Sequence, residues 1–435
     1  MTAATAPGTT AKNYRYLVGF ILMVVYTFNF LDRQIVAILA EPIRKELGLS
    51  DTQLGMLTGL YFALVYTTFG IPVAWLADRT NRVRIVAAAC FLWSLFTIGC
   101  GMAQNFLTLA LSRMGVGIGE AGGSPPSYSL ISDYFPPLER GRGLAIYSLG
   151  VPLGSMFGAG LGGWIEAHYG WRQAFIAVGA PGVLLALLTL LVVREPKRGG
   201  LDPYLDGQTA HEPSPPLLAA VGRFFANRTL VLVALSSGLS AFVGYAVLNW
   251  APSFMRREKG MDAEEIALYY SLVLGIAGVI GTFGAGWLVD RLSRLNARWY
   301  AFVPAIAFAV SIPFFIGMLM APSWPLALVF FAFPALLNNM YLAPALVVVQ
   351  NAVAPGLRTV TSAILLFILN LIGLGLGPLY VGRISDHFAR TPGEGNLLYG
   401  LAALVPIIVL TILAHYAASH SIKRDQRLAA VTGEG

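Results

Sequence analysis

Two pairs of charged residues interrupt apolar segments that are long enough to span a membrane. Asp32 and Arg33 lie in the middle of residues 17–40, where every other residue is uncharged. Arg113 and Glu120 are seven residues apart in another such segment. On a helix this spacing places both side chains on one face, about 10 Å apart along the axis. Because a charge inside a bilayer is costly, such residues usually have partners and mark the pathway of an ion or a substrate.

Neighbouring positions on a helix project about 100° apart, so Asp32 and Arg33 need not pair with each other. Asn29 and Arg33 are four residues apart and share a face. We expect Asp32 and Glu120 to compensate Arg33 and Arg113 around a central cavity. A carboxylate there can take up a proton, whereas arginine stays charged, which predicts proton coupling by Asp32 and Glu120. Arg33, Arg113 and Asn29 are predicted to bind substrate. The alternative is a static charge network that fixes helix register.

The composition indicates a membrane protein. Of the 435 residues, 56% are hydrophobic and only 12% are charged, against roughly 25% charged in soluble domains. Apolar runs of about 20 residues, each long enough to span a bilayer as a helix, recur along the chain. They are too long for the short alternating strands of a porin-like barrel. We therefore predict an all-α polytopic membrane protein with twelve transmembrane helices.

The basic residues indicate the orientation of the chain. With the N-terminus inside, nineteen Lys and Arg residues lie in the tails and inside loops and eight in the outside loops. This bias places both termini in the cytoplasm, and it also explains the net charge of +7 without a nucleic-acid partner. The first apolar run is too long for a signal peptide and is predicted to be an uncleaved span. We expect a multi-pass protein of the inner (cytoplasmic) membrane.

The chain divides into two similar halves. Residues 195–228 are rich in proline, glycine and charge, which indicates a cytoplasmic linker with a short surface helix near its end. Residues 1–194 and 229–435 are each expected to form a pseudo-symmetric bundle of six helices. WLADRTNR recurs as WLVDRLSR, with Asp78 and Asp290 212 residues apart, and GSMFGAGLGG recurs as GLGLGPLYVG at an offset of 219. Repeats of this kind are typical of secondary transporters.

These motifs resemble those of the major facilitator superfamily. AWLADRTNR follows the loop signature G-x-x-x-D-R-x-G-R, with Ala74 and Asn81 in place of the glycines, and GSMFGAGLGG resembles the fifth-span signature, with Ala159 in place of proline. That signature is associated with antiporters, although close packing also explains its glycines. NFLDRQ, ADRTNR, RMGVGIGEA and VREPKRG together resemble the Spinster branch, most closely its bacterial homologues.

The resemblance implies a transporter that works by alternating access. Animal Spinster proteins are associated with export of sphingosine-1-phosphate and lysophospholipids, which suggests an amphipathic lipid-like anion or a lipophilic compound as substrate. The nearest alternative is another small organic anion or a drug carried by the same fold. A membrane enzyme or a channel fits less well, because neither a nucleophile with its base nor a continuous polar pore is evident.

The second half has long uncharged stretches, and no Asp, Glu, Lys or Arg occurs in residues 299–357 or 359–382. Its part of the cavity is expected to be apolar and amide-lined, suiting the hydrocarbon of an amphipathic substrate. Helix packing and an interfacial position are the alternatives for each candidate. The candidates are Tyr245, Asn249, Trp250, Asn339, Tyr341 and Asn370.

The repeated Asp-Arg loops are predicted to act as gates. Asp78 and Asp290 would pair with arginines such as Arg142 or Arg358 when the inside is closed. The alternative is that the loop charges set only topology. The predicted gating residues are Asp78, Arg79, Arg82, Arg142, Asp290, Arg291, Arg294 and Arg358.

No motif for catalysis is apparent. The chain has no P-loop, HExxH or GxSxG sequence, and its two GxGxxG matches lie inside apolar spans, where no dinucleotide site is expected. We predict no enzyme activity, no catalytic or metal-binding residue and no cofactor, with a proton gradient as the energy source. The expected partners are the small amphipathic substrate, protons and the lipid bilayer, and the chain is expected to be a monomer.

Overall fold

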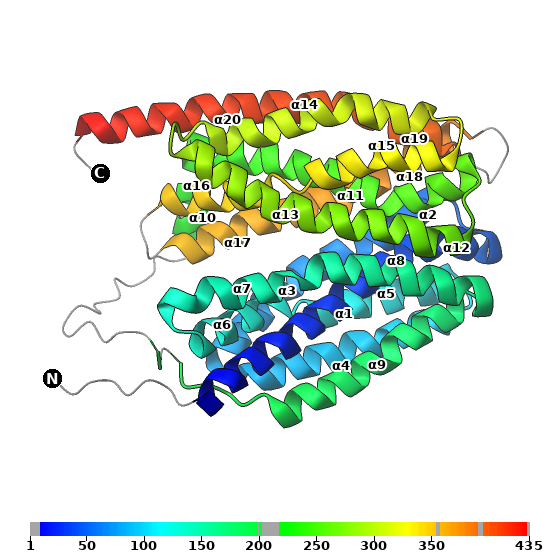
Figure 1. Cartoon of the computed structure of the whole chain (residues 1–435), viewed down its shortest axis with the longest axis horizontal. Helices are drawn as coiled ribbons and strands as arrows, with labels where there is room; N and C mark the ends of the chain where they lie inside the picture. Colours follow the sequence, from blue (N-terminus) through cyan, green and yellow to red (C-terminus); the bar gives the residue numbers. More distant parts are fainter. Residues whose placement is uncertain (1–8, 199, 202–216, 354–356, 390–394, 433–435) are drawn as a thin grey trace. The chain divides into compact units, whose positions relative to one another are not determined.

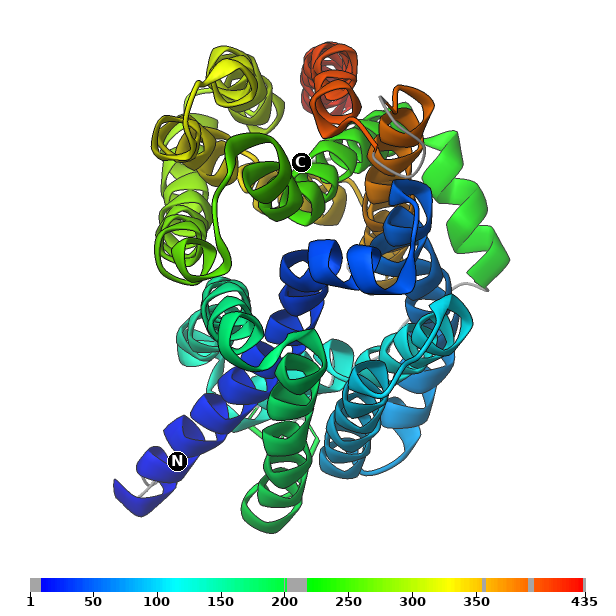
Figure 2. The ribbon, with the colours of Figure 1, turned by 90° about the vertical axis from the view of Figure 1, so that its right-hand side faces the viewer.

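Helices form all the regular structure among the residues described by the computed structural model, which are 9–198, 200–201, 217–353, 357–389 and 395–432 (Figure 1). A helix satisfies every backbone hydrogen bond within its own segment, which a lipid environment requires. The predicted all-α fold is thereby confirmed. The long helices of each part run in roughly similar directions and are seen nearly end-on in Figure 2.

The chain separates into two compact units. Unit 1 takes the described residues of Met1–Leu39 and Val65–Gln208. It holds most of α1 (Thr9–Leu47) and α3 (Tyr61–Arg79), and all of α4 (Arg82–Gly101), α5 (Phe106–Glu120), α6 (Ser124–Tyr134), η2 (Pro137–Glu139), α7 (Arg140–Ser148), α8 (Gly150–Tyr169) and α9 (Trp171–Val192).

Unit 2 takes the described residues of Ala40–Leu64 and Thr209–Gly435. The first segment supplies the end of α1, α2 (Asp51–Gly55), the π-helical turn η1 (Met56–Leu60) and the start of α3. The second supplies α10 (Leu217–Ala226), α11 (Arg228–Lys259), α12 (Ala263–Glu265), η3 (Ile266–Tyr270), α13 (Ser271–Ser293), α14 (Trp299–Met320), α15 (Trp324–Leu337), α16 (Leu342–Asn351), α17 (Arg358–Leu369), η5 (Asn370–Leu376), α18 (Gly377–His387), α19 (Leu397–Ala402) and α20 (Leu404–Thr432).

The division between the units falls inside α1, because residues 40–64 make most of their contacts with helices of unit 2. The two contact units thus have different bounds from the predicted halves at 1–194 and 229–435. The predicted linker at 195–228 includes residues 202–216, which lie outside the described residues. The last part of this segment forms the helix α10. Phe224 of α10 packs in the buried core of unit 2 with Leu230 and Val233.

Eleven helices of the described chain are long and apolar enough to cross a membrane. The fourth of the twelve predicted spans, around Val116, is not among them because it is broken into α5 and α6. The break falls at Gly122 and Gly123, just before Pro125 and Pro126 near the start of α6, which have no backbone N–H to continue the first helix. With this broken span, the architecture is consistent with the twelve predicted spans.

Glycines on α8 let its backbone lie directly against α1. A Cβ atom on Gly158 would lie 2.7 Å from the carbonyl oxygen of Leu31, and Gly154 and Gly150 are as crowded against α1 one and two turns earlier, respectively. Small residues at four-residue spacing permit this close approach. The contact fixes the part of α1 that carries Asp32 and Arg33.

Candidate functional site

Asp32 and Arg113 form a buried ion pair between α1 and α5. The Oδ2 atom of Asp32 accepts a hydrogen bond from Nη1 of Arg113 at 3.2 Å, and each residue is only 1% exposed. The second carboxylate oxygen, Oδ1, accepts a hydrogen bond of 2.7 Å from the hydroxyl of Thr97 on α4. Asp32 is therefore held from two neighbouring helices of unit 1.

Arg33 pairs with the other carboxylate. Its Nε donates to Oε2 of Glu120 at 2.6 Å, and Glu120 is 1% exposed. The guanidinium carbon lies 5.1 Å from the ring centre of Phe30 and 4.8 Å from that of Tyr66, within the range of cation–π attraction. Arg33 is thus enclosed by a carboxylate and two aromatic rings.

The two pairs form one charge-balanced cluster in unit 1, which we call the central cluster (Asp32, Arg33, Arg113 and Glu120). The carboxyl groups of Asp32 and Glu120 also lie close enough to interact with each other. Two neighbouring carboxylates, each with its own arginine, can hold one additional proton.

Several polar atoms of the cluster and of the same part of α1 are buried without a hydrogen-bond partner among the described residues. These atoms are Oε1 of Glu120, Oδ1 of Asn29 and Nε2 of Gln34, and all three residues are at most 3% exposed. An unsatisfied buried polar atom is costly, which suits a site that takes up a proton, water or a polar ligand group. Gln34 was not among the predicted binding residues.

The six uncharged candidates from the second half of the sequence all lie in unit 2 but differ in exposure. Trp250 of α11 is 2% exposed, and its indole N–H donates to the carbonyl oxygen of Pro378 at 2.8 Å, so in this structure it packs against α18. The amide of Asn249 donates to its own helix at the carbonyl oxygen of Tyr245. Asn339 is exposed and donates to the carbonyl oxygen of Ala335.

The three other candidates are partly buried. Tyr341 lies before α16 and packs against the core of unit 2, as does Tyr245. Asn370 begins the π-helical turn η5. Substrate binding by the six uncharged candidates stays a prediction.

The first Asp-Arg loop is built around Arg82, which is only 1% exposed. Its Nε donates to Glu195 at 2.7 Å, and its Nη1 donates to Ser129 at 2.7 Å and to Asp133. The other carboxylate oxygen of Glu195 accepts from the backbone N–H of Val83. Arg82 therefore joins the start of α4 to α6 and to the segment after α9.

Asp78 and Arg79 are exposed at the end of α3. Arg79 lies over the ring of Trp75 at 4.0 Å. The guanidinium of Arg198, from the predicted linker, donates to the carbonyl oxygens of Ala77 and Asp78 and thus caps the C-terminal end of α3. Here Asp78 contributes its backbone oxygen.

The remaining gating candidates are also at the surface. Asp290, Arg291, Arg294 and Arg142 are exposed, and neither Asp78 nor Asp290 has an ion-pair partner among the side chains that the structure describes. The side chain of Arg358 lies outside the described residues. The gating role of these residues stays a prediction.

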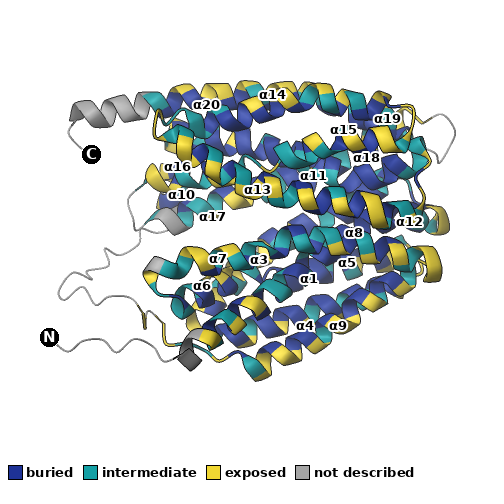
Figure 3. Ribbon diagram, viewed as in Figure 1, coloured by how far each residue is buried: buried dark blue, intermediate teal, exposed yellow. Residues whose placement is uncertain are grey.

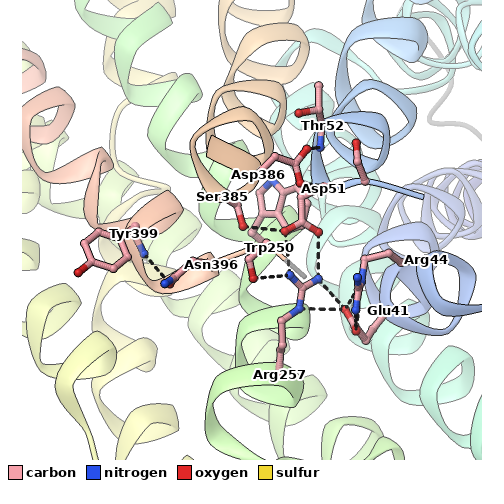
Figure 4. A network of polar contacts seen from close by, with 12 residues as sticks. Glu41, Arg44, Asp51, Thr52, Trp250, Arg257, Ser385, Asp386, Asn396 and Tyr399 are labelled. Carbon is pink, nitrogen blue, oxygen red and sulfur yellow. Dashed lines mark hydrogen bonds and ion pairs between the residues drawn. The ribbon is translucent and has the colours of Figure 1, made fainter. Parts of the chain in front are cut away.

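Unit 2 contains a second buried charge network that the sequence analysis missed. Arg257 of α11 donates from Nη2 to Glu41 at 2.8 Å, and from Nη1 and Nη2 to the two carboxylate oxygens of Asp51 at 2.8 and 3.0 Å (Figure 4). Arg44 donates to Glu41 at 2.9 Å. Glu41 is 5% and Asp51 1% exposed. The network therefore holds the end of α1 and the start of α2 against α11.

The same network includes the end of α18. Ser385 donates from its hydroxyl to Asp51 at 2.6 Å. The carboxylate of Asp386 accepts from the backbone N–H groups of Asp51 and Thr52, at 3.0 and 2.7 Å, and caps the start of α2 (Figure 4). We call these residues the Arg257 network: Glu41, Arg44, Asp51, Arg257, Ser385 and Asp386.

A sequence signal for this network did exist. Glu41 and Arg257 are 216 residues apart, between the offsets of 212 and 219 that relate the repeated motifs. Glu41 and Arg257 therefore occupy nearly equivalent positions near the ends of α1 and α11. An acid and a base at equivalent positions of the two repeats are candidates for an ion pair.

Comparison with known proteins identifies the family. The sequence model of the Major Facilitator Superfamily matches residues 22–378. The chain is 32% identical over 406 residues to an MFS-type efflux pump of Mycolicibacterium smegmatis, covering 93% of this chain and 92% of the pump. It is 26% identical over 344 residues to a probable galactarate/D-glucarate transporter of Bacillus subtilis, covering 74% of this chain and 73% of that protein.

A solved structure agrees with this assignment. The crystal structure of a bacterial homologue of the human lysosomal transporter Spinster, in an inward-facing and unoccupied conformation, superimposes with a TM-score of 0.86. The two sequences are 33% identical, and the match covers 95% of this chain and 98% of the homologue. The chain belongs to the Major Facilitator Superfamily and, within it, to the transporters of the Spinster type.

Proposed function

We propose that this transporter couples export of an amphipathic, lipid-like anion to proton movement by alternating access. The observation that carries the proposal is the central cluster, in which two carboxylates and two arginines are paired and buried in unit 1. A fixed structural pair needs no unsatisfied atoms beside it, yet Glu120 Oε1 and Asn29 Oδ1 are buried without partners among the described residues. This favours a site that binds protons and ligand over a static network.

The proposed cycle follows from the chemistry of the cluster. Protonation of Asp32 or Glu120 neutralises that carboxylate and so weakens its ion pair with Arg113 or Arg33, respectively. The released guanidinium then binds the anionic head group of the substrate through paired hydrogen bonds. Binding of the proton and binding of the head group are thereby linked.

The substrate class rests on the different character of the two parts of the chain. The two arginines of the central cluster lie in unit 1, whereas the six candidate residues in unit 2 are uncharged. An anionic head group with a hydrocarbon tail, as in a lysolipid or sphingolipid, matches this combination. A small organic anion is the second candidate, because a relative is named as a probable transporter of sugar acids.

Movement of α1 would link the central cluster to the Arg257 network. Asp32 and Glu41 are on the same helix, nine residues or about 13 Å apart along its axis. We propose that the Arg257 network holds the outer end of α1 and that the Asp-Arg loops act on the cytoplasmic side, with both termini in the cytoplasm. The protein would lie in the cytoplasmic membrane.

Thermal stabilisation by candidate ligands tests the substrate class. The purified chain would be heated with lysophosphatidic acid, lysophosphatidylcholine or glucarate at pH 5.5 and pH 7.5. We expect the lysolipid anion to raise the melting temperature most and Arg33→Gln to remove the effect. Equal stabilisation by glucarate in the wild type would favour the second candidate, and no pH dependence would contradict linkage to a proton.

A further inference from the structure

Unit 2 has an apolar groove on its surface that is separate from both charge networks. It has a volume of about 500 Å³ and runs between α14 and α20. Its walls include Phe302, Ile306 and Ala309 of α14 and Ile412 and Tyr416 of α20. In Figure 3, exposed residues lie along both helices.

One end of the groove is positively charged. Arg298 precedes α14 and lines the groove. Its Nε is buried without a hydrogen-bond partner among the described residues. Lys423 lies further along α20, three residues after His420 and seven after Tyr416, and this spacing places it on the same helix face.

His420 holds the guanidinium of Arg298 in place. The Nδ1 of His420 lies 3.0 Å from the carbonyl oxygen of Tyr416, which can only accept, so this nitrogen carries the proton. Nε2 is therefore free to accept from Nη2 of Arg298 at 3.2 Å. Arg298 also stacks over Phe302 at 4.6 Å. The guanidinium is thereby positioned at the end of the groove, and its Nε–H has no hydrogen-bond partner among the described residues.

Aromatic side chains mark this end as the level of lipid head groups. Trp299 contacts Phe302 edge to face, and the ring of Phe302 lies 6.2 Å from that of Tyr416. Tryptophan and tyrosine are enriched at the membrane–water interface, where basic pockets between helices bind anionic head groups. The N-terminal end of α14 adds a further partial positive charge.

We propose that this groove binds one anionic phospholipid of the surrounding bilayer. The lipid phosphate would accept hydrogen bonds from Arg298 and would be attracted by Lys423. One acyl chain would lie along Ile306 and Ala309 toward the middle of α14. The orientation predicted from the basic residues places this site in the cytoplasmic leaflet. The inference does not depend on which substrate is transported.

Native mass spectrometry of the delipidated full chain tests the proposal with phosphatidylglycerol as the probe. We expect one bound lipid, and Arg298→Gln should weaken its binding about fivefold, as expected for loss of one basic residue. Ile306→Trp should weaken binding similarly by filling the groove while the charge remains. Arg294→Gln and Val329→Trp are matched controls, because both residues are exposed and neither lines the groove.

Three outcomes would overturn the proposal. Equal losses in Arg298→Gln and Arg294→Gln would show diffuse attraction to the membrane surface. Binding of phosphatidylcholine as tightly as phosphatidylglycerol would show an apolar groove without head-group recognition. Displacement of the lipid by glycerol 3-phosphate at equal concentration would show a site for free phosphate esters.

Discussion

Asp32 on α1 and Arg113 on α5 are joined at 3.2 Å with both side chains almost fully buried. Arg33, the next residue along α1, pairs instead with Glu120, seven residues after Arg113. Adjacent charges on α1 thus serve two different partners on α5. This crossed arrangement keeps the central cluster neutral and allows one pair to open while the other remains closed.

Removal of one charge from the Asp32–Arg113 pair should lower the stability of the protein more than removal of both. Arg113→Gln leaves the carboxylate of Asp32 buried without its cation, which typically costs about 3–5 kcal/mol. Asp32→Asn in the same chain should recover most of that loss. Thermal unfolding in detergent would measure both variants. Equal or additive losses in the double variant would show that the two side chains are not coupled.

Arg33→Lys should preserve the fold but weaken binding of an anionic ligand. Lysine keeps the positive charge beside Glu120 but lacks the planar fork that holds a phosphate or carboxylate through two hydrogen bonds. We expect a melting temperature near that of the wild type and an affinity for a lysolipid anion about tenfold lower. Calorimetric titration provides the measurement. Unchanged affinity would exclude Arg33 from the binding site.

Arg257→Lys should destabilise unit 2. A single ammonium group cannot replace the guanidinium that contacts Glu41 and both oxygens of Asp51. The loss of charged hydrogen bonds should lower stability by about 1–3 kcal/mol. The neighbouring substitution Arg256→Lys serves as the control. If both variants unfold at the wild-type temperature, the Arg257 network contributes little to stability in solution.

Gly158→Ala should disturb α1 without changing any charged residue. The added Cβ would lie 2.7 Å from the carbonyl oxygen of Leu31, so α8 or α1 must move, at a cost of about 1–3 kcal/mol. Gly244→Ala is the matched control, because nothing lies within 4 Å of its added Cβ. We expect reduced thermal stability and transport only for Gly158→Ala. Wild-type behaviour of that variant would contradict a rigid contact between α8 and α1.

Much of the fold could be predicted from the sequence because lipid imposes helices on long apolar runs. The broken fourth span was harder to predict, since the apolar run continues through the residues where the helix stops. Gly122, Gly123 and the prolines after them carry the signal for the break. Helix ends depend on such local backbone chemistry more than on hydropathy.

The candidate site shows a similar division. Asp32, Arg33, Arg113 and Glu120 stand out because charges are rare inside apolar runs, and the structure brings them together. Arg257 does not stand out in this way, because it lies among other charged residues at the end of α11 and its partners are more than 200 positions away. The role of Glu195 as a partner of Arg82 is likewise set by tertiary contact. Spacing along one helix predicts which side chains share a face, but it does not predict which residues of other segments they contact.

Substrate-driven proton movement tests the central claim most directly. The chain would be reconstituted in liposomes containing a pH-sensitive dye, without an imposed gradient, and a lysolipid anion would be added outside. We predict a change in internal pH with the wild type and with the exposed-acid control Glu264→Gln, and none when Asp32→Asn and Glu120→Gln are combined in one chain. Substrate movement by the wild type without a change in internal pH, or an unchanged proton signal from the double variant, would contradict proton coupling through the central cluster.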